Sequence, residues 1–398
     1  MMIETRRLEI PLAACCAVST ATLYYAQPIS SEIARELHFE SSWAGSIGGA
    51  VQIGFVMGLL LLVPLGDIFS PRRLIVGGML ASIAASLALC FSTAASWALP
   101  SLMLLGFGAA VGQVVLPIGA RFAAPEAKGR AIGAIMAGLL IGILIARPAA
   151  MIISNAYGWR VLFLGSAVFT AVAAAFAYKR LPTEAPGFAG TYLGLMISIP
   201  AMIRTSRALR TRIMLHGPMF FAFSLFWTAV PAFLTAELRL EAWKAACFFL
   251  AGLGGTLAAP LAGRLADQGC RTTPVVLATG GGVIFMGATY LAGTHVLLIA
   301  AAAFAFDFSV QTNLVMAQRE VFGSASGNGG RINSIFMASF ITCGALGSTA
   351  SLYINQHWGW DAVLLVAAGA CAIAFLIALV NSRTVTSEGH PAKLGLQR

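Results

Sequence analysis

Charged residues are scarce in this sequence, since only 10% of its 398 residues are Asp, Glu, Lys or Arg. A soluble domain carries about 25%. Hydrophobic residues make up 59% of the chain and the mean hydropathy is +0.85. This composition excludes an ordinary soluble domain and is typical of a protein that crosses a membrane many times.

The short motifs of common enzymes and metal sites are also missing. No Gly-Lys pair occurs, which excludes a Walker A nucleotide site, and neither HExxH, GxSxG nor CxxC is present. The seven cysteines lie mostly inside apolar runs, where we interpret them as small core residues. We therefore expect no enzyme activity, no cofactor and no metal.

A long internal repeat organises the chain. Residues 129–160 align without a gap on residues 330–361, with 8 of 32 positions identical, and both stretches begin Gly-Arg and contain Gly-Trp near their ends. Trp43 and Trp243 extend the match at a spacing of 200. A period this long is not that of a solenoid; it indicates a duplicated half-protein, a common design among transporters.

Twelve apolar runs are long enough, at roughly 20 residues each, to cross a bilayer as helices. They fall at 10–30, 43–65, 74–93, 98–121, 131–153, 160–179, 213–234, 243–262, 274–293, 296–317, 332–354 and 361–381. We expect an all-α membrane protein of 12 transmembrane helices in two pseudo-symmetric six-helix bundles. The first would cover 1–180, a central cytoplasmic connection 181–212, and the second, with a short tail, 213–398.

The positive charges orient this arrangement. With both termini in the cytoplasm, 20 of the 25 Lys and Arg residues fall on the inner side and four on the outer side. This bias follows the positive-inside rule. The net charge of +10 therefore orients the protein in its membrane and does not indicate a nucleic-acid partner. We expect a multi-pass protein of the cell (inner or plasma) membrane. The middle of the connection, from Tyr192 to Ile199, is read as either a basic tether or an amphipathic helix on the inner leaflet.

Two loops on the predicted inner side carry a recognisable motif. Residues 64–74 read PLGDIFSPRRL and residues 263–271 read GRLADQGCR. Both resemble the GxLaDrxGrk loop of the major facilitator superfamily, although Val63, Ile68 and Ser70 depart from it in the first copy. The resemblance covers the whole chain and implies the fold of that superfamily, with alternating access between two bundles.

The resemblance also implies roles for the motif residues. An Asp at the end of a span can cap a neighbouring helix and pair with Arg across the domain interface. Such contacts would hold one face shut and break when it opens, although plain topology signalling by loop charges is the alternative. The residues of this cytoplasmic gate would be Asp67, Arg72, Arg73, Gly263, Asp267 and Arg271.

Three further stretches resemble the bacterial drug/proton antiporter-like branch: residues 24–28 (YYAQP), Gly129-Arg130, and residues 331–334 (RINS). Leu102 and Ile143 depart from that branch, which usually has Arg and Pro there. In the superfamily, spans 1, 4, 7 and 10 line the central cavity. The polar and aromatic residues of those spans that we expect there are Tyr24, Tyr25, Gln27, Gln113, Phe223, Trp227, Gln311 and Asn313.

Asp307 is the outstanding residue of the sequence, because by this topology every other carboxylate lies in a loop or near a membrane face. An ionised group in mid-span costs several kcal/mol, which favours uptake of a proton. The matching position in the first half is Gly106. Asp307 is therefore our candidate for proton coupling, and a structural Asp bonded to a neighbouring helix is the alternative.

Arg147 is a second charge within a span, where Ser348 is its counterpart. An intramembrane Arg normally has a partner. Arg147 could bind an anionic substrate, pair with Asp307, or lock the two bundles together, which we favour because span 5 belongs to the interface set of the superfamily. Arg130 and Arg331, at equivalent positions of the repeat, are further candidates for an interface or anion contact.

The predicted function is that of a proton-coupled secondary active transporter, an antiporter that exports a small organic compound. The alternatives are proton-coupled uptake of a small organic anion, and a non-transporting membrane sensor on the same scaffold. Its partners would be the small-molecule substrate, protons and the lipid bilayer, and a monomer is the default expectation.

Overall fold

A computed structural model describes residues 2–122, 128–183, 192–270, 272–323 and 329–388 of the chain. Within these ranges the chain is all-helical and contains no strand. In the first half the helices are α1 (Met2–Tyr24), α2 (Ser30–Glu36), η1 (Ser41–Trp43), α3 (Gly45–Leu61), η2 (Val63–Asp67), α4 (Pro71–Cys90), α5 (Ala95–Ala109), α6 (Val111–Phe122), α7 (Lys128–Tyr157) and α8 (Trp159–Arg180). Then follow α9 (Tyr192–Thr205), α10 (Arg207–Ala232), η4 (Phe233–Glu237), α11 (Ala242–Phe248), η5 (Phe249–Gly252), α12 (Leu253–Asp267), α13 (Thr273–Ala292), α14 (Val296–Gly323) and α15 (Gly329–Glu388).

Ten helical segments of the described chain are long and apolar enough to cross a membrane. Nine of them each cover one predicted span, and the tenth, residues 331–382, covers the last two. Gly359 has a left-handed backbone (φ 79°) inside α15 and divides it into two helices. The first predicted span is a shorter apolar helix, Glu9–Tyr24, which ends before Pro28. An all-helical protein is confirmed, while the count of twelve spans and the two bundles stay predictions.

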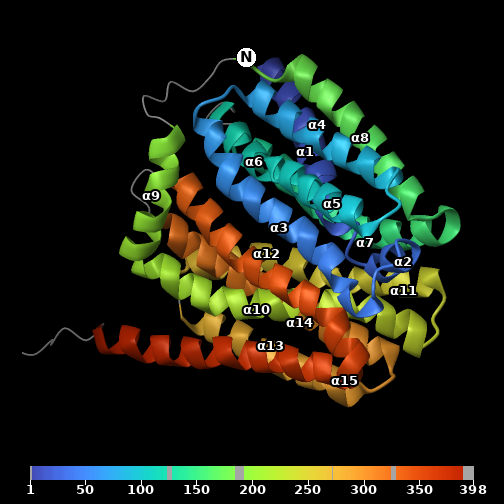
Figure 1. The fold of residues 1–398 in the computed structure, drawn as a ribbon. Coiled ribbons are helices and arrows are strands. Elements are labelled where there is room, and N and C mark those ends of the chain that lie inside the picture. The colour runs from blue at the N-terminus through green and yellow to red at the C-terminus, as the bar shows by residue number, and fades with distance from the viewer. Residues whose placement is uncertain (1, 123–127, 184–191, 271, 324–328, 389–398) are drawn as a thin grey trace, which may run out of the picture.

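The two halves of the chain lie on opposite sides of a long seam. Figure 1 shows the blue and green helices α1, α4, α5, α6 and α8 along the upper side and the yellow to red helices along the lower side. Along the seam, α3 packs lengthwise against the first part of α15, and α7 packs against α11. Trp43 and Tyr353 meet across this seam, with ring centroids 5.5 Å apart.

The repeat read from the sequence also appears in the packing. A Cβ atom added to Gly54 would lie 2.6 Å from the carbonyl carbon of Met103, and one added to Gly254 would lie 2.8 Å from that of Phe304. The two pairs are related by 200 and 201 residues. Only glycine permits so close a backbone approach. The close contact of α3 with α5 in the first half therefore recurs between α12 and α14 at the equivalent position of the second half.

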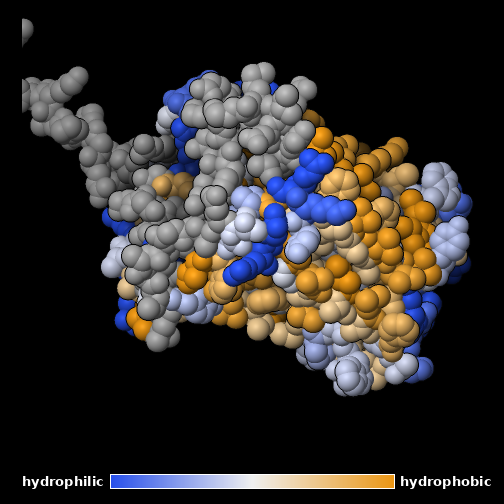
Figure 2. Space-filling view, turned by 90° about the horizontal axis from the view of Figure 1, so that it is seen from above, coloured by the Kyte–Doolittle hydropathy of each residue, from blue (hydrophilic) through white to orange (hydrophobic). Residues whose placement is uncertain are grey.

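The outer surface suits a lipid environment. Large apolar side chains such as Phe169, Leu291, Leu297 and Val380 are exposed on the helices. Figure 2 shows hydrophobic residues over much of one face, with hydrophilic residues at its right-hand rim and beside the grey atoms. Soluble monomers rarely expose so many large apolar side chains side by side. The protein is therefore a membrane protein.

The central connection contains the helix α9, at one end of the seam (Figure 1). The Tyr192 hydroxyl donates a hydrogen bond to the Leu61 carbonyl (3.0 Å), next to the end of α3. Ile199 and Met202 pack on the apolar cluster that joins α3 to α15. This segment therefore contains a helix, and its Ile199 and Met202 lie against a cluster formed by both halves. Its place on the inner leaflet stays a prediction.

The close approach at Gly54 yields a stability prediction. Gly54→Val should destabilise the protein by about 1–3 kcal/mol, because a larger side chain must push α3 off the Met103 backbone. The measurement is the thermal unfolding midpoint of the purified protein in detergent. Gly77→Val on α4 is the matched control, since a Cβ there meets nothing within 4 Å. Equal midpoints for the two variants would contradict this packing.

Candidate functional site

Asp307 lies buried at the middle of α14, with 8% of its surface exposed. Its carboxylate accepts two hydrogen bonds, from the Trp227 indole nitrogen (3.1 Å) and from the Gly255 backbone nitrogen (3.2 Å). A Cβ added to Gly255 would lie 2.5 Å from the Asp307 Oδ2 atom. Gly255 therefore leaves the space that the carboxylate occupies, and helices α10 and α12 supply its donors.

Arg147 lies buried on α7 and is only 3% exposed. Its guanidinium donates one hydrogen bond, to the Gln27 side-chain oxygen (3.3 Å), and its Nε atom has no partner. Four aromatic rings surround the guanidinium carbon at 4.7 to 6.0 Å from their centroids: Trp227, Tyr24, Phe223 and Phe249. Cation–π attraction to these rings is strong where water is excluded, so it offsets part of the cost of burying this charge.

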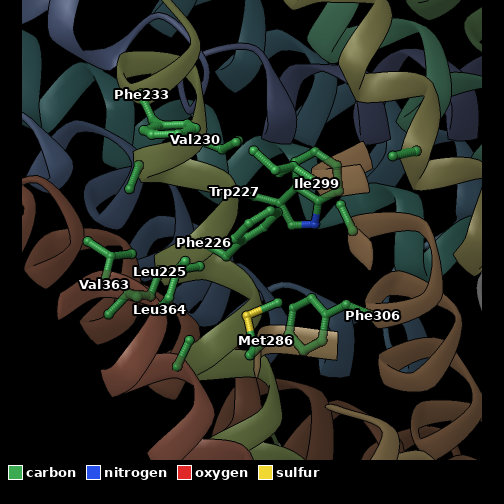
Figure 3. Close-up of a cluster of buried hydrophobic side chains, with 14 of the residues drawn as sticks. Leu225, Phe226, Trp227, Val230, Phe233, Met286, Ile299, Phe306, Val363 and Leu364 are labelled. Atoms are coloured by element: carbon green, nitrogen blue, oxygen red, sulfur yellow. The ribbon is translucent and has the colours of Figure 1, made fainter. Parts of the chain in front are cut away.

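Trp227 connects the two buried charges. Its ring lies 4.7 Å from the Arg147 guanidinium carbon, and its nitrogen bonds to Asp307. Among the described residues no ion pair within 4 Å joins Arg147 to Asp307. Figure 3 shows Trp227 on α10 within an apolar cluster that includes Phe226 and Ile299. This apolar packing fixes the indole, and the indole in turn fixes the distance between the charges.

A string of hydrogen bonds crosses the seam beside Arg147. The Gln27 amide nitrogen donates to the Thr228 hydroxyl (2.9 Å), which is also bonded to the Ser348 hydroxyl (2.9 Å). Ser348 donates in turn to the Gly45 carbonyl (3.3 Å). Gln27 and Gly45 belong to the first half of the chain, and Thr228 and Ser348 to the second. The string therefore holds the halves together at the level of the buried charges.

A small cavity lies next to this string, with a volume of about 30 Å³. Its lining residues are Leu23, Tyr24, Gln27, Gly48, Gln52, Phe220, Phe223, Ser224 and Ile341. A water molecule needs about 10–15 Å³ of such space, whereas sites for small organic ligands span roughly 300–1,000 Å³. This cavity is therefore too small for a small organic ligand in the described conformation.

The other cavity residues expected from the sequence are more scattered. Tyr25 packs beside the apolar cluster of α2, α3 and α8, while Gln113 and Gln311 are half-buried. Asn313 is fully buried, with its amide nitrogen 3.1 Å from His216 Nδ1 and 3.2 Å from Met219 Sδ. None of these four residues lines the small cavity.

Sequence reasoning missed several polar residues of the site. Gln52 lines the cavity, and its amide nitrogen lies 3.4 Å from the Ser224 hydroxyl. Thr228 and Ser348 belong to the string across the seam. Gln52 had a usable signal, because it is an amide within the apolar run 43–65. Ser and Thr give no such signal, since they are common in spans and often bond to their own helix.

The first copy of the loop motif makes its described contacts with the end of α8 and the residue that follows it. Arg72 donates to the Leu181 carbonyl (2.8 Å) and lies 5.5 Å from the centroid of the Tyr178 ring. Arg73 is exposed. The side chain of Asp67 lies outside the described residues.

In the second copy of the motif, Asp267 has a different partner from Arg271, which we expected from the resemblance. Asp267 forms an ion pair with Arg319 of α14, which is also in the second half. Arg271 lies outside the described residues, and a Cβ on Gly263 would meet nothing within 4 Å. This Asp267 ion pair does not cross the seam, so a gate role for these residues stays a prediction.

Arg130 and Arg331 lie apart from the buried charges. Arg130 forms an ion pair with the nearly buried Glu9 of α1 (3.2 Å). Arg331 lines a second small pocket near α9, together with Leu59, Met196 and Ile335. Arg331 therefore lies near α9, Arg130 lies where α7 meets α1, and an anion contact at either stays a prediction.

Comparison with known proteins agrees with this arrangement. The model of the Major Facilitator Superfamily matches residues 12–329. The uncharacterized transporter YgaY of Escherichia coli O157:H7 is 33% identical over 379 residues, covering 94% of this chain and 93% of that protein. The chloramphenicol resistance protein of Streptomyces lividans is 24% identical over 394 residues, covering 97% and 98%.

A solved structure supports the same fold. The nucleoside transporter NupG superposes with a TM-score of 0.76 at 10% identity, covering 94% of this chain and 99% of the other. An identity this low speaks for the fold alone. The family model spans most of the sequence and the YgaY match spans nearly all of it, so this chain is a member of the Major Facilitator Superfamily of transporters.

Proposed function

We propose that the protein is a proton-coupled antiporter that exports a small organic compound from the cell by alternating access. The single observation that carries this proposal is the burial of the Asp307 carboxylate at the middle of α14, where it is hydrogen-bonded to the same Trp227 ring that contacts the buried Arg147. A carboxylate in such a place can take up and release a proton as its surroundings change.

The contacts of Asp307 suggest how its protonation would follow the movement of the halves. Two N–H donors, from Trp227 and Gly255, stabilise the ionised carboxylate in the closed conformation. Trp227, on α10 of the second half, also lies against the Arg147 guanidinium, which belongs to α7 of the first half. Separation of the halves would withdraw the Arg147 charge from Trp227 and Asp307. The neutral, protonated acid would then be favoured, which links proton uptake to the conformation.

A small organic compound as substrate is supported by the lining of the cavity, and export is supported by the name of one relative. Tyr24, Phe220 and Phe223 present aromatic rings, and Gln27 and Gln52 present amides, a combination suited to a partly apolar organic molecule. The name of the chloramphenicol resistance protein associates that relative with resistance to an organic compound. The cell membrane as location, both termini in the cytoplasm, and a monomeric state are parts of the same proposal.

Proton-coupled uptake of a small organic anion is the second candidate. Arg147 favours it, because this guanidinium has no carboxylate within 4 Å among the described residues and its Nε atom has no hydrogen-bond partner. A substrate carboxylate could provide both interactions. A non-transporting sensor remains a third reading, and neither the buried charges nor the cavity favours it.

Proton release from acidified inside-out vesicles tests the antiport proposal. Lipophilic cations, small organic acids and chloramphenicol would be added in turn to vesicles that carry wild-type protein or Asp307→Asn. We expect at least one compound to release protons from wild-type vesicles. Asp307→Asn should abolish this release, because an amide cannot take up the coupled proton. Glu241→Gln, at an exposed carboxylate, is the control and should behave as wild type.

The results separate the candidates. Equal proton release by wild type and Asp307→Asn would exclude Asp307 as the coupling group. Silence of every compound in vesicles with well-expressed wild-type protein would contradict export of these classes. Uptake of a labelled small organic acid that depends on Arg147 would then favour the second candidate.

A double-mutant cycle tests the role of Arg147 in holding the helices together. Arg147→Met should be destabilising, because the ionised Asp307 loses the nearby positive charge and Gln27 loses its donor. Arg147→Met combined with Asp307→Asn should recover part of this loss, with a coupling energy of about 0.5–3 kcal/mol. Unfolding midpoints in detergent provide the measurement, and the pair Arg147→Met with Glu241→Gln should be additive. Additivity in the first pair would show that the two charges act independently.

A further inference from the structure

Three polar contacts join α10 to α14 in a row. Trp227 meets Asp307, His216 meets Asn313 (3.1 Å), and Arg212 meets Glu320, with its Nε atom 3.0 Å from the carboxylate. As the residue number falls on α10 it rises on α14, so the helices are antiparallel. From Asp307 to Glu320 the row covers 13 residues, about 20 Å of helix. We call this row the polar column.

Unsatisfied polar atoms collect along the polar column. Arg212 Nη1, His216 Nε2, Thr312 Oγ1 and Asn313 Oδ1 are buried and lack a hydrogen-bond partner in the described structure. His216 and Asn313 are completely buried. Buried polar atoms in proteins are nearly always paired, either with protein groups or with ordered water. The column therefore has the chemistry of a chain of side chains and water molecules.

The two ends of the polar column differ in their access to water. Asp307 is buried in mid-span, whereas the Glu320 side chain is 36% exposed, at the end of the bundle where α9 lies. The groups that face His216 apart from the column are aromatic: Phe220 on its own helix, and Phe336 and Phe340 on α15. Arg212, one turn away on α10 and paired with Glu320, is its nearest charged neighbour along the column. Among the described contacts, the polar continuation from His216 therefore runs only along α10 and α14.

We propose that the polar column is the path by which protons move between Asp307 and the α9 end of the protein, and that His216 is its relay residue. This rests on the proposed proton exchange at Asp307. The Asn313 amide nitrogen can only donate, so it bonds to the basic Nδ1 atom and Nε2 carries the hydrogen. In each passage a water molecule takes the place of this amide and gives a proton to Nδ1, while Nε2 releases its own proton to a second water molecule. The ring then returns to its first tautomer by exchange with water, so no charge remains on the ring. Asn313 orients the ring and the water beside it.

The proposal is distinct from simple helix packing. Polar contacts between membrane helices also serve as attachment, each worth about 0.6 kcal/mol on average. Attachment requires paired atoms, however, whereas this column has donors and acceptors that point to no protein partner. A packing role would change stability when the residues are replaced. A relay role would change the rate at which Asp307 exchanges its proton.

The test follows protonation of Asp307 directly, so it needs no substrate. The purified full-length protein in detergent is given a rapid drop in pH, and time-resolved infrared spectroscopy records the carbonyl stretch of protonated carboxylic acids. The part of this band that Asp307→Asn removes belongs to Asp307. His216→Phe suits the aromatic surroundings but cannot carry a proton, and Asn313→Leu removes the orienting amide.

We expect both variants to keep the amplitude of the Asp307 band and to slow its appearance about tenfold or more, since a positioned proton-transfer group contributes about 100-fold or more to such steps. His295→Gln, at an exposed histidine, and Thr289→Val, at a buried hydroxyl that bonds to its own helix, should follow wild type. If one variant fails to fold, the other carries the test.

Two results would overturn the proposal in distinguishable ways. Wild-type rates in His216→Phe or Asn313→Leu, with the Asp307 band present, would exclude the polar column as the path and leave the role of Asp307 intact. A wild-type protein without any band that depends on Asp307 would overturn proton exchange at Asp307 itself, and with it the function proposed above.

Discussion

The burial of two opposite charges among membrane-spanning helices is the constraint on which the rest of this structure depends. Inside a bilayer a charged side chain must find its partners within the protein. Asp307 receives them from α10 and α12, and Arg147 receives them from Gln27 and a box of aromatic rings. Since these partners come from several helices, the two charges constrain how those helices are placed. The fully buried indole of Trp227 contacts both groups.

The same constraint explains how a closed conformation can also open. The string from Gln27 through Thr228 and Ser348 to Gly45 is made of neutral hydrogen bonds, each worth about 0.5–1.5 kcal/mol net. Water that enters an opening cavity can replace each of them. The buried ionised groups are different, because they lose far more when their partners leave. In the function proposed above, the protein keeps weak bonds across this seam and changes the charge state of Asp307 when it opens.

The sequence predicted the coarse features because they depend on composition and spacing. Apolar runs predicted the helices, and the isolated carboxylate predicted a buried Asp307. It did not predict that the first apolar run would end as a helix at Tyr24, or that Asp267 would pair with Arg319. Those details depend on which helices become neighbours. His216 was missed for the same reason: a histidine near the start of a span is unremarkable until Asn313 lies beside it without satisfying its second nitrogen.

The duplication offers an account of how Asp307 came to be tolerated. In the first half, Gly106 lies at the matching position, and a Cβ there would lie 2.8 Å from the backbone nitrogen of Phe55. In the second half the counterpart of Phe55 is Gly255, whose backbone nitrogen donates to Asp307. The two helices therefore approach closely in both halves. The glycine lies on α5 in the first half, but in the second half it lies on α12, the helix equivalent to α3. With glycine at position 255 on α12, the contact leaves room for a side chain on α14 and exposes an N–H donor to it. A carboxylate fits that space because the N–H donor offsets part of the free-energy cost of removing the carboxylate from water. An apolar side chain would leave this donor without a hydrogen bond.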